Sequence, residues 1–187
     1  WAHLDIRMNQ NLKSAIGFRM AQLCHDIIPL QYPHFYRAHD VEAFREYFER
    51  AFAFADLVIF TSRKVEGDVR AYCAGHEIAL QATAVTPLGA SAGPGRGTTA
   101  ELPLGLQAGQ YALLVSTIEP RKGHRMIYNV WRRLLDEGIP QAKGFKLLFV
   151  GRPGWLVDDL MRDLVEDPRI KGSLHILKDV DDDMLAT

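Results

Sequence analysis

The chain has 187 residues, of which 48% are hydrophobic and 24% charged, and its formal net charge at neutral pH is −1. This ordinary globular composition, with no long basic tract, argues against nucleic-acid binding. Two distant cysteines, Cys24 and Cys73, exclude a disulfide framework or a CxxC zinc site, so we expect a reducing, cytoplasmic compartment. The most apolar window, residues 51–60, is too short to span a bilayer.

The first half of the chain alternates short apolar runs with helical patterns. Strands that alternate with helices predict βαβ units and a parallel sheet. The expected strands cover residues 18–24, 57–61 and 80–86, and the expected helices cover 40–55, with Asp40 as its cap, and 63–74. Residues 1–17 predict a surface loop or short helix, and residues 27–36 a loop rich in aromatic residues and proline.

Three polar residues follow the strands of this half. His25 and Asp26 follow the first strand and Ser62 follows the second. Ligands of parallel α/β sheets bind beyond the carboxyl ends of the strands, which favours a functional role. The structural alternative is that His25 is a histidine with satisfied hydrogen bonds, Asp26 caps a turn and Ser62 caps the next helix.

Residues 89–109 contain six glycines and two prolines and give the strongest boundary signal in the chain. We predict that they form a linker between part of one α/β unit, residues 1–88, and part of a second, residues 110–187. A linker of this composition suits a hinge between two domains, and the alternative is a passive tether.

The second half repeats the alternation of strands and helices. Its expected strands cover residues 111–116, 145–150 and 173–177, and its expected helices cover 123–137 and 155–165, with Asp181 capping a further helix. The first strand, YALLV, is apolar throughout, as expected for a parallel strand covered on both faces. The first helix is expected to bury an apolar stripe made of Met126, Val130, Trp131, Leu134 and Leu135.

The turn between the first strand and helix of this half carries Glu119, Pro120, Arg121, Lys122 and Gly123. A basic turn before a helix N-terminus favours anions, because free backbone N–H groups and the helix dipole attract negative charge. The alternative is that the two basic residues are solvated loop charges. A second glycine turn, residues 151–154, predicts a tight bend that needs the backbone freedom of glycine. Dinucleotide, P-loop, zinc-peptidase and α/β-hydrolase motifs are absent from the sequence.

Several unconnected blocks of the sequence carry recognisable motifs. They are CHDIIPL, ADLVIFTSRKVEGDV and VTPLGA in the first half, followed by STIEPRKGHRMIYNVWRRLL, KLLFVGRPGW and LHILKDVDDDML in the second. In this order the blocks closely resemble glycosyltransferase family 4 enzymes of the GT-B fold, in a subgroup that includes mannosyltransferases. The resemblance implies an α/β protein with parts of two facing Rossmann-like domains and a reaction in the cleft between them. The N-terminal domain would handle the acceptor and the C-terminal domain would bind a nucleotide sugar.

The resemblance also implies roles for individual residues. Lys122 stands at the family lysine that contacts the donor diphosphate, and Arg121, Gly123 and Thr117 are expected beside it. His25 matches a catalytic histidine near the transferred sugar. The further candidates for the cleft are Asp26, Ser62 and Gly89.

The implied activity is the retaining transfer of a sugar, such as mannose from GDP-mannose, to a glycan or lipid-linked acceptor. No metal and no other cofactor would be required, and peripheral association with the inner face of a membrane is expected. The chain departs from the family pattern at Leu88, where relatives have asparagine, and at Ser116–Thr117, where many relatives have arginine. The family's pair of glutamates and its N-terminal glycine-rich loop are missing, so we expect an incomplete and inactive fragment. The alternatives are a noncatalytic nucleotide- or partner-binding module and another nucleotide-sugar enzyme, such as an epimerase.

Overall fold

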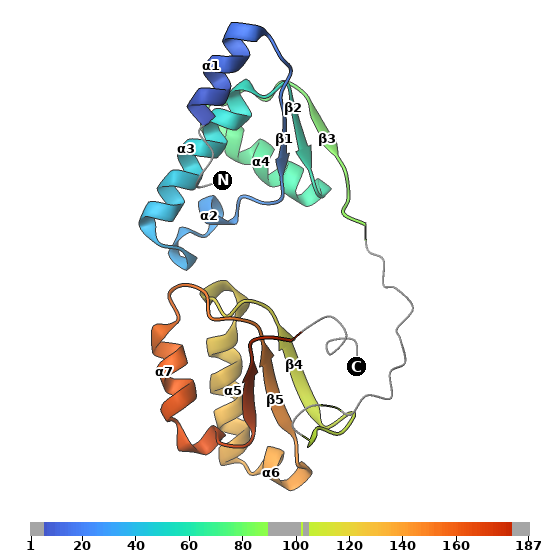
Figure 1. Cartoon of the computed structure of the whole chain (residues 1–187), viewed down its shortest axis with the longest axis vertical. Coiled ribbons are helices and arrows are strands. Elements are labelled where there is room, and N and C mark those ends of the chain that lie inside the picture. The colour runs from blue at the N-terminus through green and yellow to red at the C-terminus, as the bar shows by residue number, and fades with distance from the viewer. Residues whose placement is uncertain (1–5, 90–101, 103–104, 181–187) are drawn as a thin grey trace. The chain divides into compact units, whose positions relative to one another are not determined.

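The computed structural model describes residues 6–89, 102 and 105–180. The chain divides into two units, Trp1–Ser91 (unit 1) and Ala92–Thr187 (unit 2), and each contains a three-stranded parallel sheet (Figure 1). This confirms the predicted α/β class. The division falls within the predicted linker, most of which lies outside the described residues, so its role as a hinge stays a prediction.

Unit 1 has the strand order β1-β2-β3, so each strand pairs with the next one along the chain. In the register of the sheet, Leu23 lies opposite Ile59, which lies opposite Ala84. The strands are β1 (Ala21–Cys24), β2 (Leu57–Phe60) and β3 (Thr83–Val85), and the helices are α1 (Ile6–Ile16), α2 (Ile28–Gln31), α3 (Ala38–Phe54) and α4 (Arg63–Gly75), with a 3₁₀ turn, η1, at Pro33–Phe35.

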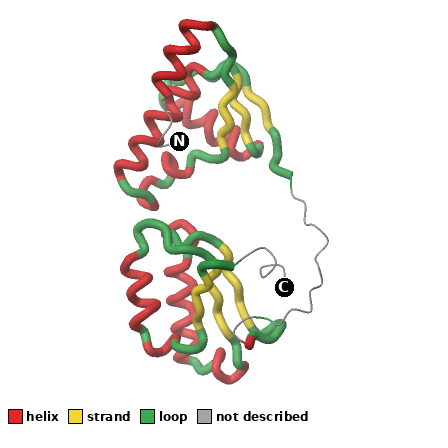
Figure 2. The backbone as a smooth tube through the Cα atoms, in the orientation of Figure 1, coloured by secondary structure: helices red, strands yellow, loops and turns green. Residues whose placement is uncertain are grey.

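The core of unit 1 lies between one face of its sheet and the helices. Phe44, Phe48 and Phe52 follow one another along α3, with neighbouring ring centroids 4.4 and 5.3 Å apart. They pack in one cluster with Val58 and Phe60 of β2. Connections between parallel strands are almost always right-handed, so helices that connect sequential strands lie on the same face of the sheet. Figure 2 shows the helices of unit 1 beside its strands.

Four predictions for unit 1 need correction. α3 begins at Ala38 and Arg37 is its N-cap residue, so Asp40 lies inside the first turn and does not cap the helix. The negative charge of Asp40 there interacts favourably with the positive end of the helix dipole. The predicted loop over residues 27–36 contains α2 and η1, because proline is tolerated in the first turn of a helix. The first and third strands are shorter than predicted and cover only Ala21–Cys24 and Thr83–Val85.

Unit 2 has the same sequential strand order, β4-β5-β6. Its helix α6 was not predicted, because its few residues, IPQAK, carry no helical period. The strands are β4 (Tyr111–Val115), β5 (Lys146–Val150) and β6 (Leu174–Leu177), the helices are α5 (His124–Asp136), α6 (Ile139–Lys143) and α7 (Asp158–Glu166), and the 3₁₀ turns are η3 (Pro120–Lys122) and η4 (Pro168–Ile170). The predicted cap at Asp181 lies outside the described residues.

The buried face of α5 differs from the predicted stripe. Trp131 and Leu135 are buried as predicted, together with His124 and Tyr128, whereas Met126 and Val130 are 66% and 53% exposed. The strand that precedes α5 also differs from expectation: two of its side chains, Leu113 and Val115, are about half exposed, so β4 is not covered on both faces. Within the described residues, no helix is long and apolar enough to cross a membrane.

A buried carboxylate ties the connection between α7 and β6 to α5. Asp167 accepts hydrogen bonds from the Arg169 guanidinium at 2.8 Å and from the Tyr128 hydroxyl at 2.8 Å, and its Oδ2 lies 3.2 Å from Nε of Arg132. Its side chain is only 6% exposed. The Arg169 hydrogen bonds lower the pKa of Asp167 well below its usual range, and the Tyr128 hydroxyl acts in the same direction.

Asp167→Asn is therefore expected to lower the free energy of unfolding of unit 2 at pH 7 by about 2 kcal/mol, because a hydrogen-bonded buried charge is lost. The contribution of Asp167 is present above its unfolded pKa, near 4, and is lost as the pH falls towards the lower folded value. Urea unfolding should show the difference from the wild type shrinking below about pH 4. Glu166→Gln at the exposed end of α7 is the control, and a difference independent of pH would contradict the prediction.

Candidate functional site

The loops that follow β4 and β5 run side by side beyond the ends of the strands. The Ser116 N–H donates to the Val150 carbonyl at 2.9 Å, and the Ile118 N–H donates to the Arg152 carbonyl at 3.0 Å. The Gly154 N–H returns a hydrogen bond to the Ile118 carbonyl at 2.9 Å. Because Ile118 is also fully buried in the core, the start of the turn before α5 is held at a fixed position.

Two glycines make this close approach feasible. A Cβ at Gly151, whose φ is +150°, would lie 2.0 Å from the Ser116 carbonyl oxygen. A Cβ at Gly154 would lie 2.9 Å from Cγ2 of Thr117 and 3.2 Å from the Ile118 oxygen. The prediction that this bend needs glycine is therefore confirmed, and the reason includes contact with the β4 loop as well as backbone freedom.

The turn itself ends in an uncapped helix N-terminus. η3 leads to Gly123, which has a φ of +76° and precedes α5 without any side chain capping the helix. The first N–H groups of such a helix have no intrahelical partner and carry the positive end of its dipole. Lys122 is exposed beside them. Its backbone N–H donates to the Glu119 carbonyl at 3.1 Å, whereas its side-chain ammonium has neither a hydrogen bond nor an ion pair to another described residue.

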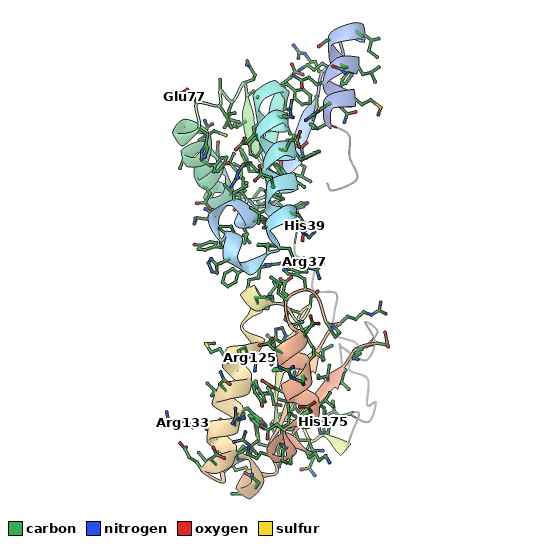
Figure 3. The ribbon with its side chains drawn as sticks, turned by 90° about the vertical axis from the view of Figure 1, so that its left-hand side faces the viewer. Arg37, His39, Glu77, Arg125, Arg133 and His175 are labelled. Carbon is green, nitrogen blue, oxygen red and sulfur yellow. The ribbon has the colours of Figure 1, made fainter. Side chains whose placement is uncertain are left out.

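The arginines around Lys122 differ from it, because acidic side chains already compensate their charges. Nε of Arg121 lies 2.5 Å from Oε1 of Glu119, a carboxylate only 1% exposed; the two atoms are not aligned for a hydrogen bond, so the contact is an ion pair. Arg125, labelled in Figure 3, pairs with Asp159 at 2.7 Å and with Asp163, both on α7. Lys122 is thus the cation of this turn that is free to meet an anion.

His124 begins α5 as a buried histidine. Its ring packs edge-on against Phe149, with centroids 4.9 Å apart. Burial lowers the pKa of His124 below its usual value and the nearby Lys122 charge acts in the same direction, while the backbone of Glu119 acts in the opposite direction.

Polar atoms without partners gather at this turn. Of the five buried side-chain atoms that lack a hydrogen-bond partner among the described residues, four belong to Ser116, Glu119 and His124. Buried polar groups are normally paired, and exceptions often mark sites that bind water, ions or ligands. The β4–α5 turn is therefore the candidate site of unit 2.

The corresponding edge of unit 1 brings His25 and the β2–α4 junction together. The Thr61 hydroxyl donates to the His25 carbonyl at 3.1 Å, while His25 itself is exposed. Oδ1 of Asp26 accepts from the Ile28 N–H at 3.1 Å and so shapes the entry to α2. Ser62 caps α4 by accepting from the Val65 N–H at 3.2 Å, as predicted.

The remaining predicted residues lie at these same two edges. Thr117 is exposed in the β4 loop with its methyl group against Gly154, and Gly89 is exposed beyond the end of β3. The structure therefore groups Lys122 with its predicted neighbours in one turn, and places the others at the carboxyl edge of the first sheet. Within the described residues, no group of three His, Cys, Asp or Glu side chains could hold a metal ion.

The burial of Glu119 and of His124 could not be predicted from the sequence pattern of this turn. A glutamate in a basic turn is expected to be exposed, and only the structure shows that it is buried against Arg121. The one available signal for His124 was its spacing from Tyr128, Trp131 and Leu135, which continues the apolar period of α5 towards its N-terminus.

No family model matches the chain. Two curated relatives, both named serotype-specific mannosyltransferase WbdA from Escherichia coli, are each 30% identical to it over 198 aligned positions, or 99% of this chain. A third relative of the same name and organism is 28% identical over 183 positions, or 92% of this chain. The chain spans about a quarter of the length of these relatives, since the alignments cover 24%, 23% and 22% of them. It is thus similar to one region of known mannosyltransferases.

Gly151→Ala is expected to lower the free energy of unfolding of unit 2 by about 3 kcal/mol or more, because the added Cβ would overlap the Ser116 carbonyl oxygen. Thermal unfolding followed by circular dichroism would measure the loss. Gly67→Ala on α4 is the matched control: its Cβ would meet nothing within 4 Å, and we expect no loss of stability. Equal effects of the two substitutions would contradict the close approach of the loops.

Arg121→Ala is expected to lower the free energy of unfolding of unit 2 by about 3 kcal/mol, because it leaves the buried Glu119 carboxylate unpaired. Adding Glu119→Gln to this variant should restore part of the loss. The control is Arg133→Ala, which removes an ion pair on the surface of α5 where the arginine is 83% exposed, and it should cost less than about 1 kcal/mol. Urea unfolding of all variants would test the ranking.

Proposed function

We propose that this chain is part of a glycosyltransferase and that the β4–α5 turn of unit 2 binds the diphosphate of its nucleotide-sugar donor. The observation that carries the proposal is the exposed Lys122 side chain, which no acidic side chain compensates, beside an uncapped helix N-terminus. The same turn gathers buried side-chain atoms that lack a hydrogen-bond partner among the described residues. The similarity to mannosyltransferases supports the same class of reaction.

In this proposal the turn stabilises charge that develops on the leaving group. When the bond between the sugar and the nucleoside diphosphate breaks, negative charge accumulates on the phosphate oxygens. Lys122 and the first N–H groups of α5 would stabilise that charge without a metal ion or other cofactor. Gly123 lets the backbone approach the phosphates, Thr117 offers a hydroxyl, and Arg121 contributes less because Glu119 compensates its charge.

Unit 1 would supply the side chains on the acceptor side. His25 is the candidate catalytic histidine, exposed at the carboxyl end of β1, and Asp26 holds its loop through the hydrogen bond to the Ile28 N–H. Ser62 and Gly89 belong to the same edge of the sheet. The transfer would retain the configuration of the sugar.

The names of the relatives make mannose the first sugar to test, with GDP-mannose as the donor. The acceptor would be a glycan or a lipid-linked glycan on the cytoplasmic side, with peripheral contact to a membrane in the lipid-linked case. These substrates belong to the proposal, as does the placement of the chain in polysaccharide synthesis.

Calorimetric titration of the chain with GDP, UDP and ADP would test the donor site. One nucleoside diphosphate should bind, and Lys122→Ala should weaken its binding by about 10- to 100-fold, because a charge-assisted contact of about 1.5–3 kcal/mol is lost. The matched control is Lys143→Ala on α6, an exposed lysine that should leave the affinity unchanged.

If the wild type and Lys122→Ala bind the nucleoside diphosphate with equal affinity, Lys122 does not contact the diphosphate and the proposed role of this residue is wrong. Binding of a nucleoside diphosphate without any hydrolysis or transfer from its sugar conjugate would favour the alternative of a noncatalytic binding module.

A further inference from the structure

Aromatic rings gather beyond the carboxyl end of β1 in unit 1, where Tyr32 and His34 are exposed and Phe35 is half-buried. They belong to the segment that follows His25 and Asp26 and that runs through α2 and η1. Tyr32 and Phe35 have ring centroids 6.2 Å apart, and the His34 ring lies 4.2 Å from Phe35 and 6.3 Å from Tyr32. We call these three residues the aromatic platform.

The aromatic platform is not part of the core. None of its three rings belongs to the hydrophobic cluster of unit 1, whereas Ile27 and Leu30, just before it, do. Tyr32 is 50% exposed, and His34 is exposed as well. Because α2 and η1 hold their own backbone hydrogen bonds, such as Tyr32 N–H to the Ile28 carbonyl at 2.8 Å, the rings are presented on ordered turns.

Polar residues follow the aromatic platform along the chain, at the start of α3. Arg37, at the cap of α3, is exposed, and the side chain of His39 is 74% exposed with its Nε2 3.3 Å from Oδ1 of Asp40. Figure 3 labels Arg37 and His39 at the start of α3, the helix that follows η1. The surface therefore combines aromatic faces with hydrogen-bonding groups that reach outward.

This combination fits a sugar. The C–H groups on one face of a pyranose ring are weakly positive and apolar, and they complement the negative face of an aromatic ring. The ring hydroxyls need donors and acceptors at the border, which Arg37, His39 and Asp40 offer.

We propose that the aromatic platform binds a sugar ring of the acceptor glycan, with Tyr32 as the principal stacking residue and Arg37 and His39 as hydrogen-bonding partners of the sugar hydroxyls. The identity of this glycan rests on the proposed glycosyltransferase function. The platform lies on the segment that continues directly from His25, the candidate catalytic histidine, so a bound acceptor would meet unit 1 at the edge where transfer is proposed.

The test is the binding of a mannotriose to the whole chain without nucleotide. Saturation-transfer NMR measures this binding. Tyr32→Ala should weaken binding by about fivefold to tenfold, since one stacking contact is lost. Tyr32→Phe keeps the ring and should bind like the wild type. Leu12→Ala, which trims a side chain of α1 that is 47% exposed, is the control and should change nothing.

Two results would overturn the proposal that the aromatic platform binds a sugar. In the first, the wild type does not bind mannotriose. In the second, Tyr32→Ala binds mannotriose as tightly as the wild type does. The proposal is also overturned if Tyr32→Ala leaves glycan binding intact and instead abolishes binding to phosphatidylglycerol vesicles, because the rings would then contact lipid. Nucleotide titration remains a separate readout, so failure of GDP, UDP and ADP to bind would remove the proposed donor site and leave the glycan result standing.

Discussion

The pairing of the β4 and β5 loops is the constraint on which the candidate donor site depends. Beyond the strands, Ile118 exchanges backbone hydrogen bonds with the β5 loop, and this is feasible only because Gly151 and Gly154 carry no side chain. The pairing fixes where the turn leaves the sheet, and therefore where Lys122 and the N-terminus of α5 lie. A site that must hold a charged ligand gains from such a rigid base, because little reorganisation remains to be made on binding.

Charge compensation then separates residues that the sequence presents as equals. Arg121, Lys122 and Arg125 stand close together in the chain, yet two of them face acidic partners and only Lys122 has none among the described residues. Burying the Glu119 carboxylate costs free energy unless Arg121 stays beside it. The ion pair with Glu119 therefore holds the Arg121 side chain in place. The turn thereby keeps one uncompensated cation at its surface, while the arginine charges are held in ion pairs.

The sequence predicted the parallel α/β units, most strands and the basic turn, because apolar runs, glycine turns and helix periods are local signals. Helix faces were harder: α5 buries His124 and Tyr128 while Met126 and Val130 are exposed, since the sheet determines which side of an amphipathic helix is covered. The short helices α2 and α6 begin with isoleucine and proline and were missed because proline usually signals a loop. Burial of Glu119 and the contact of Thr61 with His25 come from residues brought together by folding, which spacing alone does not encode.

The strand order described for each sheet also bears on how the chain folds. Within each sheet every described strand pairs with its successor, yet the paired residues lie far apart in the chain, as with Ala21 and Leu57 or Tyr111 and Lys146. The connections from β1 to β2 and from β4 to β5 each hold two helices, and parallel pairing across such connections is slower to form than contacts within a helix. Each strand pair can therefore close only after the helices between its two strands have left the ribosome, and the N-terminal strands of each sheet are available first.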